Sequence, residues 1–199
     1  MQKIFDSLID SYIADQVGIA EFFLSDPLAA HLKENLIALY SKKLLVAAGV
    51  GNDKLIHDQQ VRGDRIYWLD RKNNDPYENQ FFDLIDQFVS YLNATCYTGI
   101  TGYEFHYTMY EDGRFYKKHI DQFRSNGSRQ YSLIMYLNPH WQETDGGELC
   151  IHHSGFQQNI SPSYGKGVMF KSSELEHEVL VTHKQRMSIT GWLKINNGI

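Results

Sequence analysis

The sequence predicts a mainly β protein in which short strands form a sandwich or barrel and helices pack outside one sheet. Apolar residues recur at helical spacing through much of the first half, and from Tyr103 onward they alternate with a period of two. Turn sequences separate the strand-like segments, the pattern of a sandwich or barrel. The 13 Tyr and 11 Phe favour a strand-rich core over a helical bundle.

Three helices are expected in the first half of the chain. An apolar stripe at helical spacing runs from Ile4 to Ile13, and residues 17–24 are short and apolar enough for a strand. Asp26-Pro27 reads as a cap followed by proline at the first helical position, so a second helix should continue towards residue 43. A third helix is expected over residues 81–92.

The rest of the chain should be loops and strands. Residues 46–61 are polar and contain glycine, which predicts a long flexible loop, and residues 62–69 should be extended and lead into a strand. Further strands are expected at residues 103–110, 129–137, 147–153, 167–171, 177–181 and 186–195. Because no repeat or linker interrupts this pattern, we expect one domain over 1–199, with helical support mostly in 1–95 and the barrel core in 100–195.

Composition narrows the class of partner. A net charge of −5 without a basic run argues against nucleic acid, and no apolar run reaches the ~20 residues of a membrane helix. Cys96 and Cys150 are too few for a disulfide framework and suggest reduced thiols. The first residues soon become amphipathic and acidic, unlike a signal peptide. We therefore expect a cytoplasmic protein.

His119 and Asp121 are the first candidate metal ligands. Residues two apart on an extended chain point to the same side, so both can face one ion, with His177 arriving from a neighbouring strand. Two histidines and a carboxylate hold iron(II) with open positions, whereas zinc accepts the same ligands with a water. His152 and His153 are adjacent and would face opposite ways, and His106 is expected to be a hydrogen-bonded core histidine.

Arg186 is the candidate anion-binding residue. It alternates with Ser188, Thr190 and Trp192, so these four side chains should share one face of a strand. A buried arginine needs a partner, and a guanidinium can hold a ligand carboxylate through two parallel hydrogen bonds. Structural ion pairing with a distant Asp or Glu is the alternative. Tyr136 could add its hydroxyl to the same carboxylate, or could simply be a core residue.

Together these residues resemble the 2-oxoglutarate- and iron(II)-dependent oxygenases, in particular the prolyl hydroxylase branch with the animal oxygen-sensing enzymes and their bacterial relatives. The resemblance covers roughly residues 18–194. The matching segments are His119-Ile120-Asp121, Met135-Tyr136-Leu137-Asn138 with Trp141, Gly146-Gly147-Glu148-Leu149, His177-Glu178-Val179, Arg186 with Ile189-Thr190-Gly191-Trp192, and Arg62-Gly63-Asp64-Arg65-Ile66-Tyr67-Trp68.

The resemblance implies a double-stranded β-helix, a cupin-like jelly-roll barrel, with N-terminal helices packed on one sheet. His119, Asp121 and His177 would be the iron ligands at the catalytic centre. Arg186 would bind the distal carboxylate of 2-oxoglutarate with Tyr136, while Tyr110 would lie near the keto-acid end. The resemblance also suggests that Thr190 and Trp192 line this pocket. Ser188 departs from the family, because some relatives have a small apolar residue there, and we expect it to add a hydroxyl to the carboxylate-binding group.

The same resemblance implies a substrate loop. The segment 62–68 would close over the substrate, with Asp64 pairing with Arg129 to shape the entrance, and Arg62 belongs to this segment. Residues 45–60 match the family poorly, and substrate choice usually depends on such loops.

The implied reaction is hydroxylation of a prolyl residue in a protein, with O2 as oxidant, release of succinate and CO2, and ascorbate as a reductant. The expected partner is a protein with an exposed, flexible, proline-containing segment, and bacterial members of the family suggest elongation factor Tu. Hydroxylation of a free amino acid or another small molecule is an alternative. A non-catalytic metal-binding jelly roll is another, but the complete triad with Arg186 argues against it.

Overall fold

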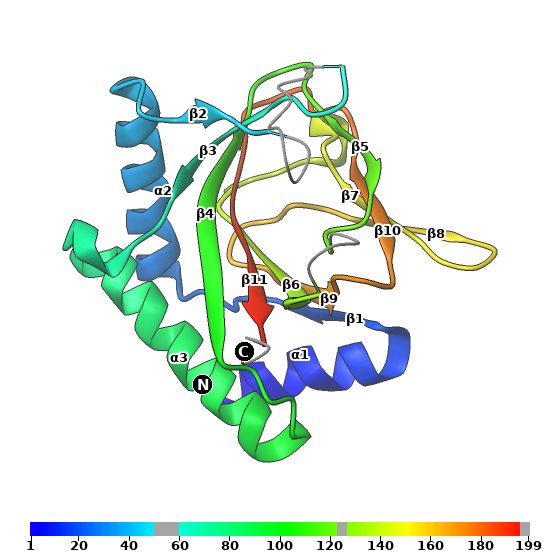
Figure 1. The fold of residues 1–199 in the computed structure, drawn as a ribbon. Helices are drawn as coiled ribbons and strands as arrows, with labels where there is room; N and C mark the ends of the chain where they lie inside the picture. The colour runs from blue at the N-terminus through cyan, green and yellow to red at the C-terminus, as the bar shows by residue number, and fades with distance from the viewer. Residues whose placement is uncertain (50–59, 123–126, 196–199) are drawn as a thin grey trace.

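The protein consists of two antiparallel β-sheets that face each other, with helices covering the outer side of the larger one (Figure 1). The structure is a computed structural model and describes residues 1–49, 60–122 and 127–195. Its major sheet has the strand order β1-β9-β6-β11-β4-β3-β2, and its minor sheet has the order β5-β10-β7-β8. Both sheets are built from antiparallel pairs, so the predicted fold class is confirmed.

In the described part of the chain, the α-helices all lie before residue 100, and the elements after it are strands apart from one short 3-10 helix. In chain order they are α1 (Gln2–Asp15), β1 (Val17–Ala20), α2 (Asp26–Ser41), β2 (Val46–Ala47), β3 (Asp64–Trp68), η1 (Arg71–Asn73), α3 (Pro76–Cys96), β4 (Gly102–Tyr110), β5 (Tyr116–His119), β6 (Arg129–Tyr136), η2 (Glu143–Asp145), β7 (Leu149–His152), β8 (Gln157–Ile160), β9 (Gly167–Lys171), β10 (Glu176–Val179) and β11 (Arg186–Lys194).

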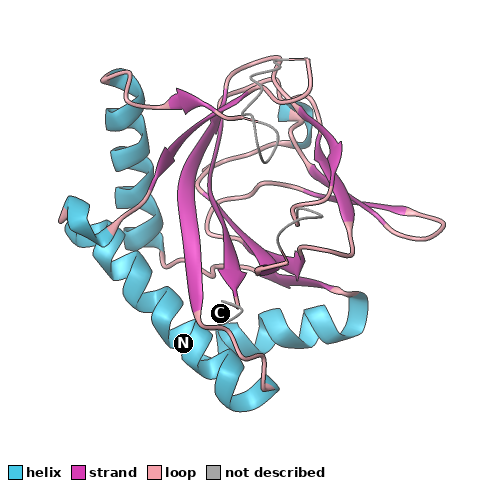
Figure 2. Cartoon of the chain, in the orientation of Figure 1, coloured by secondary structure: helices cyan, strands magenta, loops and turns pink. Residues whose placement is uncertain are grey.

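The helices pack on the major sheet because its central strands present apolar side chains on that face. On β11, Met187, Ile189 and Leu193 join the larger core, which also contains Phe5 of α1 and Phe88 of α3. Figure 2 shows the helices on this outer side of the strands. Among the described residues, no helix combines the length and the apolar character that crossing a membrane requires.

A second, smaller core lies between the two sheets. Ile134 and Tyr136 of β6 and Phe170 of β9 meet Leu149 and Ile151 of β7 there. Since neighbouring residues of a strand face opposite ways, these positions are the even members of β6 and the odd members of β7. Apolar packing therefore holds the sheets together at one end, and polar side chains occupy the rest of the space between them.

The helix predictions are confirmed, with small differences at the ends. Helix α3 begins earlier than expected because Asp75 caps it: its Oδ1 accepts hydrogen bonds of 2.9 Å from the backbone N–H groups of Tyr77 and Glu78. Helix α2 begins at Asp26, so Ser25 and not Asp26 is its N-cap residue.

The strand predictions are confirmed for β1, β3, β4, β6, β7, β9, β10 and β11. Strand β8 was not predicted, because Gln157-Gln158-Asn159 is polar and lacks the apolar alternation of the other strands. Within the expected loop 46–61, Val46–Ala47 forms the short edge strand β2, so that part of the prediction was wrong. Residues 50–59 of the predicted loop lie outside the described residues.

Gly191 should be required for the central strand pairing. A Cβ added there would lie 2.2 Å from the carbonyl oxygen of Glu104 and 2.2 Å from the ring of Phe105. Gly191→Ala should therefore lower the free energy of unfolding by about 1–3 kcal/mol or more, measured by urea denaturation. Gly102→Ala is the matched control, because nothing lies within 4 Å of its added Cβ. Equal stability of the two variants would contradict this packing.

Candidate active site

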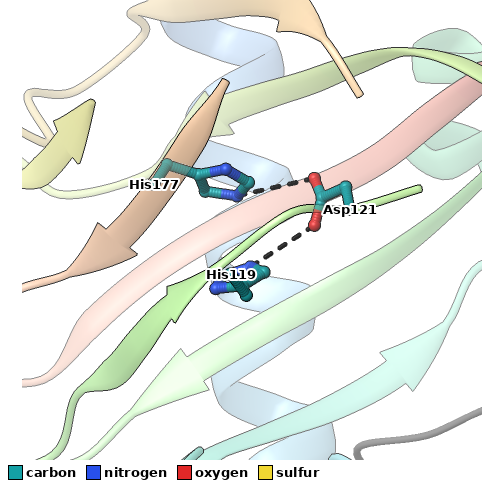
Figure 3. Close-up of side chains that lie close together, drawn as sticks. All are labelled: His119, Asp121 and His177. Carbon is teal, nitrogen blue, oxygen red and sulfur yellow. Dashed lines mark ion pairs between the residues drawn. The ribbon is translucent and has the colours of Figure 1, made fainter. Parts of the chain in front are cut away.

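Three potential metal ligands converge where β5 meets β10. His119 ends β5 and pairs with His177 of β10, while Asp121 follows β5 by two residues (Figure 3). The Asp121 carboxylate lies between the imidazoles, with 3.4 Å from its Oδ1 to His119 Nε2 and 3.6 Å from its Oδ2 to His177 Nε2. One donor atom from each side chain lies within 4.8 Å of the other two, so the group could hold a metal ion.

Backbone carbonyls orient both imidazoles. His119 Nδ1 lies 2.7 Å from the carbonyl oxygen of Lys117, and His177 Nδ1 lies 3.1 Å from that of Leu175. Carbonyl oxygens only accept hydrogen bonds, so each Nδ1 carries the proton and donates it. Each Nε2 is thereby left facing Asp121, with a lone pair for a metal when the ring is neutral.

The Asp121 carboxylate, whose side chain is 11% exposed, favours its ionised form. Burial alone would raise its pKa, but the His177 and His119 imidazoles outweigh this and hold the pKa well below its usual range. Ser132 also donates a hydrogen bond of 2.6 Å to Asp121 Oδ2, and the Ser132 and Ser172 hydroxyls are 3.0 Å apart. Asp121 thus presents a negative charge to two imidazole nitrogens.

Arg186 lies at the other end of the same pocket and is 2% exposed. Its Nε donates a hydrogen bond of 2.7 Å to the carbonyl oxygen of Gly147, and its guanidinium lies 5.3 Å and 5.1 Å from the ring centres of Tyr110 and Tyr136. No carboxylate within the described residues forms an ion pair with it. The Tyr136 hydroxyl is buried and has no hydrogen-bond partner there either.

The predicted inward face of β11 is confirmed. Arg186, Thr190 and Trp192 line the pocket together with the three candidate ligands, and Ser188 is buried on the same face. The Ser188 hydroxyl lies 3.2 Å from that of Thr190. Tyr110 is opposite Arg186 on β4 and also lines the pocket.

The predicted pair between Asp64 and Arg129 is wrong. Asp64 instead accepts two hydrogen bonds from Arg62, of 2.6 Å from Nε and 2.9 Å from Nη2. Arg129 pairs with Glu104 at 2.9 Å and stacks 3.5 Å from the ring centre of Trp192. The register explains this, because Asp64 pairs with the last residue of β4 whereas Arg129 pairs with Lys194, opposite the first.

Both arginines nevertheless lie at the edge of the site. Arg62 covers the ring of Tyr116 at 4.6 Å, and Tyr116 stacks on His119 with ring centres 3.6 Å apart. Arg129 Nη1 donates a hydrogen bond of 3.3 Å to the carbonyl oxygen of Asp121. The two arginines thus contact the metal-ligand segment from different directions.

The sequence did not single out Tyr116 or Ser132 as site residues. Tyr116 precedes His119 by three residues, and residues three apart on a strand are not expected to point to the same side. Ser132 could have been found, because it has the same strand parity as Tyr136, which was predicted to face the pocket. His106 is buried and hydrogen-bonded to Thr108, as expected, and it also lines the pocket.

This arrangement can hold a divalent metal at one end and an organic anion at the other. Two imidazoles and a carboxylate occupy one side of an ion and leave its other positions open. The pocket that joins this group to Arg186 has aromatic and apolar walls, including Ile134, Leu149 and Trp192. An anion with a carboxylate at each end could therefore reach the metal and Arg186 together.

Comparisons with known proteins agree with this chemistry. Residues 105–194 match the model of the 2OG-Fe(II) oxygenase superfamily. A PKHD-type hydroxylase from Maricaulis maris is 29% identical over 88 residues, which are 44% of this chain and 40% of that protein. One from Acaryochloris marina is 26% identical over 89 residues, with the same shares. The matched part is thus well under half of the length of these relatives.

Solved structures match almost the whole chain. A Pseudomonas putida prolyl-4-hydroxylase is 28% identical, with a TM-score of 0.87 over 97% of this chain and 100% of that one. A prolyl hydroxylase from Trichoplax adhaerens, solved with a hypoxia inducible factor oxygen degradation domain peptide fragment, shares the fold, with 21% identity and a TM-score of 0.87 over 98% and 90% of the two chains. The resemblance seen in the sequence is confirmed.

His106 should make stability depend on pH. Burial, together with the smaller effect of the Arg62 charge, lowers its pKa from 6.5 to about 4. The unfolded chain therefore binds a proton at His106 at a higher pH than the folded chain does. The contribution of neutral His106 to the free energy of unfolding is complete above pH 6.5 and is lost as the pH falls towards 4. The loss should reach roughly 3 kcal/mol.

Urea denaturation at several pH values checks this expectation. His106→Gln should flatten the dependence between pH 6.5 and 4 relative to the unmodified protein. His183→Gln, at an exposed position, should leave it unchanged. Parallel curves for the unmodified protein and His106→Gln would show that His106 does not titrate as described.

Proposed function

We propose that this prolyl hydroxylase-like protein is a 2-oxoglutarate- and iron(II)-dependent dioxygenase that hydroxylates a prolyl residue of a protein. The overall reaction converts 2-oxoglutarate, O2 and a C–H bond into succinate, CO2 and a C–OH group. One observation carries the proposal: a His/Asp/His group and a buried arginine without a carboxylate partner in the described chain line the same pocket.

The donor set fits iron(II). His119, Asp121 and His177 would hold the ion through two nitrogens and one oxygen, the combination that leaves positions open for O2 and a co-substrate. Bound iron(II) and 2-oxoglutarate supply the oxidation of the substrate C–H bond by O2. The chain keeps the ligands in place, through the carbonyls that fix both imidazoles and through the Ser132 hydrogen bond to Asp121.

The other end of the pocket fits the distal carboxylate of 2-oxoglutarate. Arg186 would bind it with the guanidinium nitrogens that do not bond to the Gly147 carbonyl oxygen. The Tyr136 hydroxyl, which has no hydrogen-bond partner in the described chain, would donate a hydrogen bond to the same carboxylate. Gly147 allows this approach, because a Cβ there would lie 3.1 Å from Arg186 Cδ. Thr190, Ser188 and Trp192 would line the same region, and Tyr110 would lie beside the co-substrate.

The rim of the pocket suits an extended peptide. Trp68 is 47% exposed and lies near Trp192, with 6.4 Å between ring centres. Arg62, with Asp64, and Arg129 would border this aromatic patch, and an apolar ring such as proline packs well against indole faces. The full-length similarity to the Pseudomonas putida prolyl-4-hydroxylase supports a prolyl target.

The finer assignments belong to the same proposal. Residues 1–199 would form one oxygenase domain, with ascorbate as reductant in vitro. Elongation factor Tu, which the sequence resemblance suggests, is the first protein to test as substrate, and it would place the reaction in the cytoplasm. An acidic chain of net charge −5 is a poor match for nucleic acid.

Arg186→Ala should weaken 2-oxoglutarate binding by about 2–5 kcal/mol, because it removes one partner of a buried charged pair. Arg186→Lys should also bind weakly, since an ammonium lacks the two-pronged donor geometry. Isothermal titration of 2-oxoglutarate into the metal-loaded variants measures both affinities.

Arg65→Ala, at a position with a half-exposed side chain, is the control and should bind normally. Metal affinity should survive in all three variants, because none of them changes a metal ligand. An unchanged 2-oxoglutarate affinity in Arg186→Ala would contradict the proposed anion site and would not affect the proposal of a metal site.

Turnover tests the reaction and the target class together. The protein, iron(II), 2-oxoglutarate and ascorbate are incubated in air with purified elongation factor Tu or with a cell lysate. We expect succinate and a peptide that has gained one oxygen atom at a proline. His177→Ala should form neither product, whereas the exposed His183→Ala should form both.

The outcomes separate the alternatives. Succinate no higher than in the His177→Ala control would exclude the enzyme and leave a non-catalytic metal-binding module. Succinate with an oxidised amino acid or other small molecule, and with unmodified peptides, would move the target away from proteins.

A further inference from the structure

A second group of metal-ligating side chains lies on the outer face of the minor sheet. Cys150 and His152 are two residues apart on β7, and Glu178 pairs with Cys150 from the adjacent strand β10. The neighbouring residues Ile151 and His177 point into the space between the sheets, so these three point away from it. Strand β10 thus presents His177 to one face and Glu178 to the other.

The donor atoms of this group are already close together. His152 Nε2 lies 2.8 Å from Glu178 Oε1 and 3.9 Å from Cys150 Sγ, and the three donors lie within 4.8 Å of one another. Tetrahedral zinc, with bonds of about 2.0–2.3 Å, separates its ligand atoms by roughly 3.5 Å. The two distances from His152 therefore need to change by less than about 1 Å, and the distance between Cys150 and Glu178 by at most about 1.3 Å. Among the described residues, only this group and the His119 group bring three such donors this close.

We propose that Cys150, His152 and Glu178 form a second metal site, which binds a borderline-soft divalent cation of the zinc type. One thiolate, one imidazole and one carboxylate make three protein ligands and leave a fourth position for water. The thiolate distinguishes the site chemically from the His/Asp/His group, whose harder donors suit iron(II).

The surroundings of His152 support its role as a ligand. The Gln157 side-chain amide, from β8, lies 3.2 Å from His152 Nδ1. Rotation of this amide by half a turn presents its oxygen, which accepts a hydrogen bond from Nδ1–H and leaves Nε2 free for the cation. A second partner on the other ring nitrogen is the usual companion of a metal-bound histidine.

Cys150 needs the cation in order to ionise. Its side chain is 2% exposed, and burial together with Glu178 raises the pKa of the thiol. The cation displaces the thiol proton to solvent, and the charge of the thiolate and of Glu178 together balances a divalent ion. The His152 and Glu178 side chains are 18% and 29% exposed and provide the approach from solvent.

A cation at this position would connect β7 to β10. Its ligand Glu178 is adjacent in sequence to His177 on β10. The cation would therefore stabilise, from the outer face of the sheet, the strand that carries His177 on its inner face. The two sites remain independent chemically, because no side chain belongs to both.

Cobalt(II) is the probe that separates the two sites. Cobalt(II) replaces zinc in such sites, and a bound thiolate produces an intense near-ultraviolet charge-transfer band that a His/Asp/His site cannot produce. Titration of the full-length, metal-free protein with cobalt(II) should produce this band, and zinc added afterwards should abolish it. Cys150→Ala should lose the band, whereas Cys96→Ser, at the exposed cysteine that ends α3, should retain it.

Two further variants keep the test decisive if Cys150→Ala does not fold. Glu178→Gln should weaken cobalt affinity by at least about 10-fold, the scale on which changes around a metal site act. His119→Ala removes a side chain of the His119, Asp121 and His177 group only, so it should retain the band. Absence of the band in the unmodified protein, or a band of equal strength and affinity in Cys150→Ala or Glu178→Gln, would overturn the proposal.

Discussion

The pairing of β10 between β5 and β7 is the constraint on which both groups of candidate metal ligands depend. It places His177 opposite His119 on the inner face and Glu178 opposite Cys150 on the outer face. A slip of one residue would exchange these faces and dismantle both groups, because side chains alternate along a strand. The apolar contacts of Leu149 and Ile151 with the major sheet oppose such a slip.

Buried charge explains the chemistry of the space between the sheets. Arg186 is removed from water and Asp121 largely so, and burial of a charge is unfavourable unless a partner compensates for it. Asp121 has its imidazoles and Ser132, whereas Arg186 has one carbonyl and two aromatic rings in the described chain. The imbalance at Arg186 is what makes an organic anion the natural complement of this pocket.

Much of the fold could be predicted because period-two alternation reports directly which face of a strand is buried. It predicted the pocket face of β11 from Arg186 to Trp192, and the same rule could have identified Ser132. It failed for β8, whose first three residues are polar, and for the partner of Asp64. Spacing along the chain cannot show that Arg129 lies at the far end of the sheet, where Glu104 is within reach.

The sequence alone determined the alternation along the strands and the kinds of side chain available at His119, Asp121, His177 and Arg186, because these depend on local periodicity and on side-chain chemistry. Only the tertiary structure decided which strands are neighbours. That choice placed Tyr116 against His119, paired Arg62 with Asp64, and brought Glu178 to Cys150 and His152. Strand order and register arise from packing between distant segments, and no local pattern encodes them.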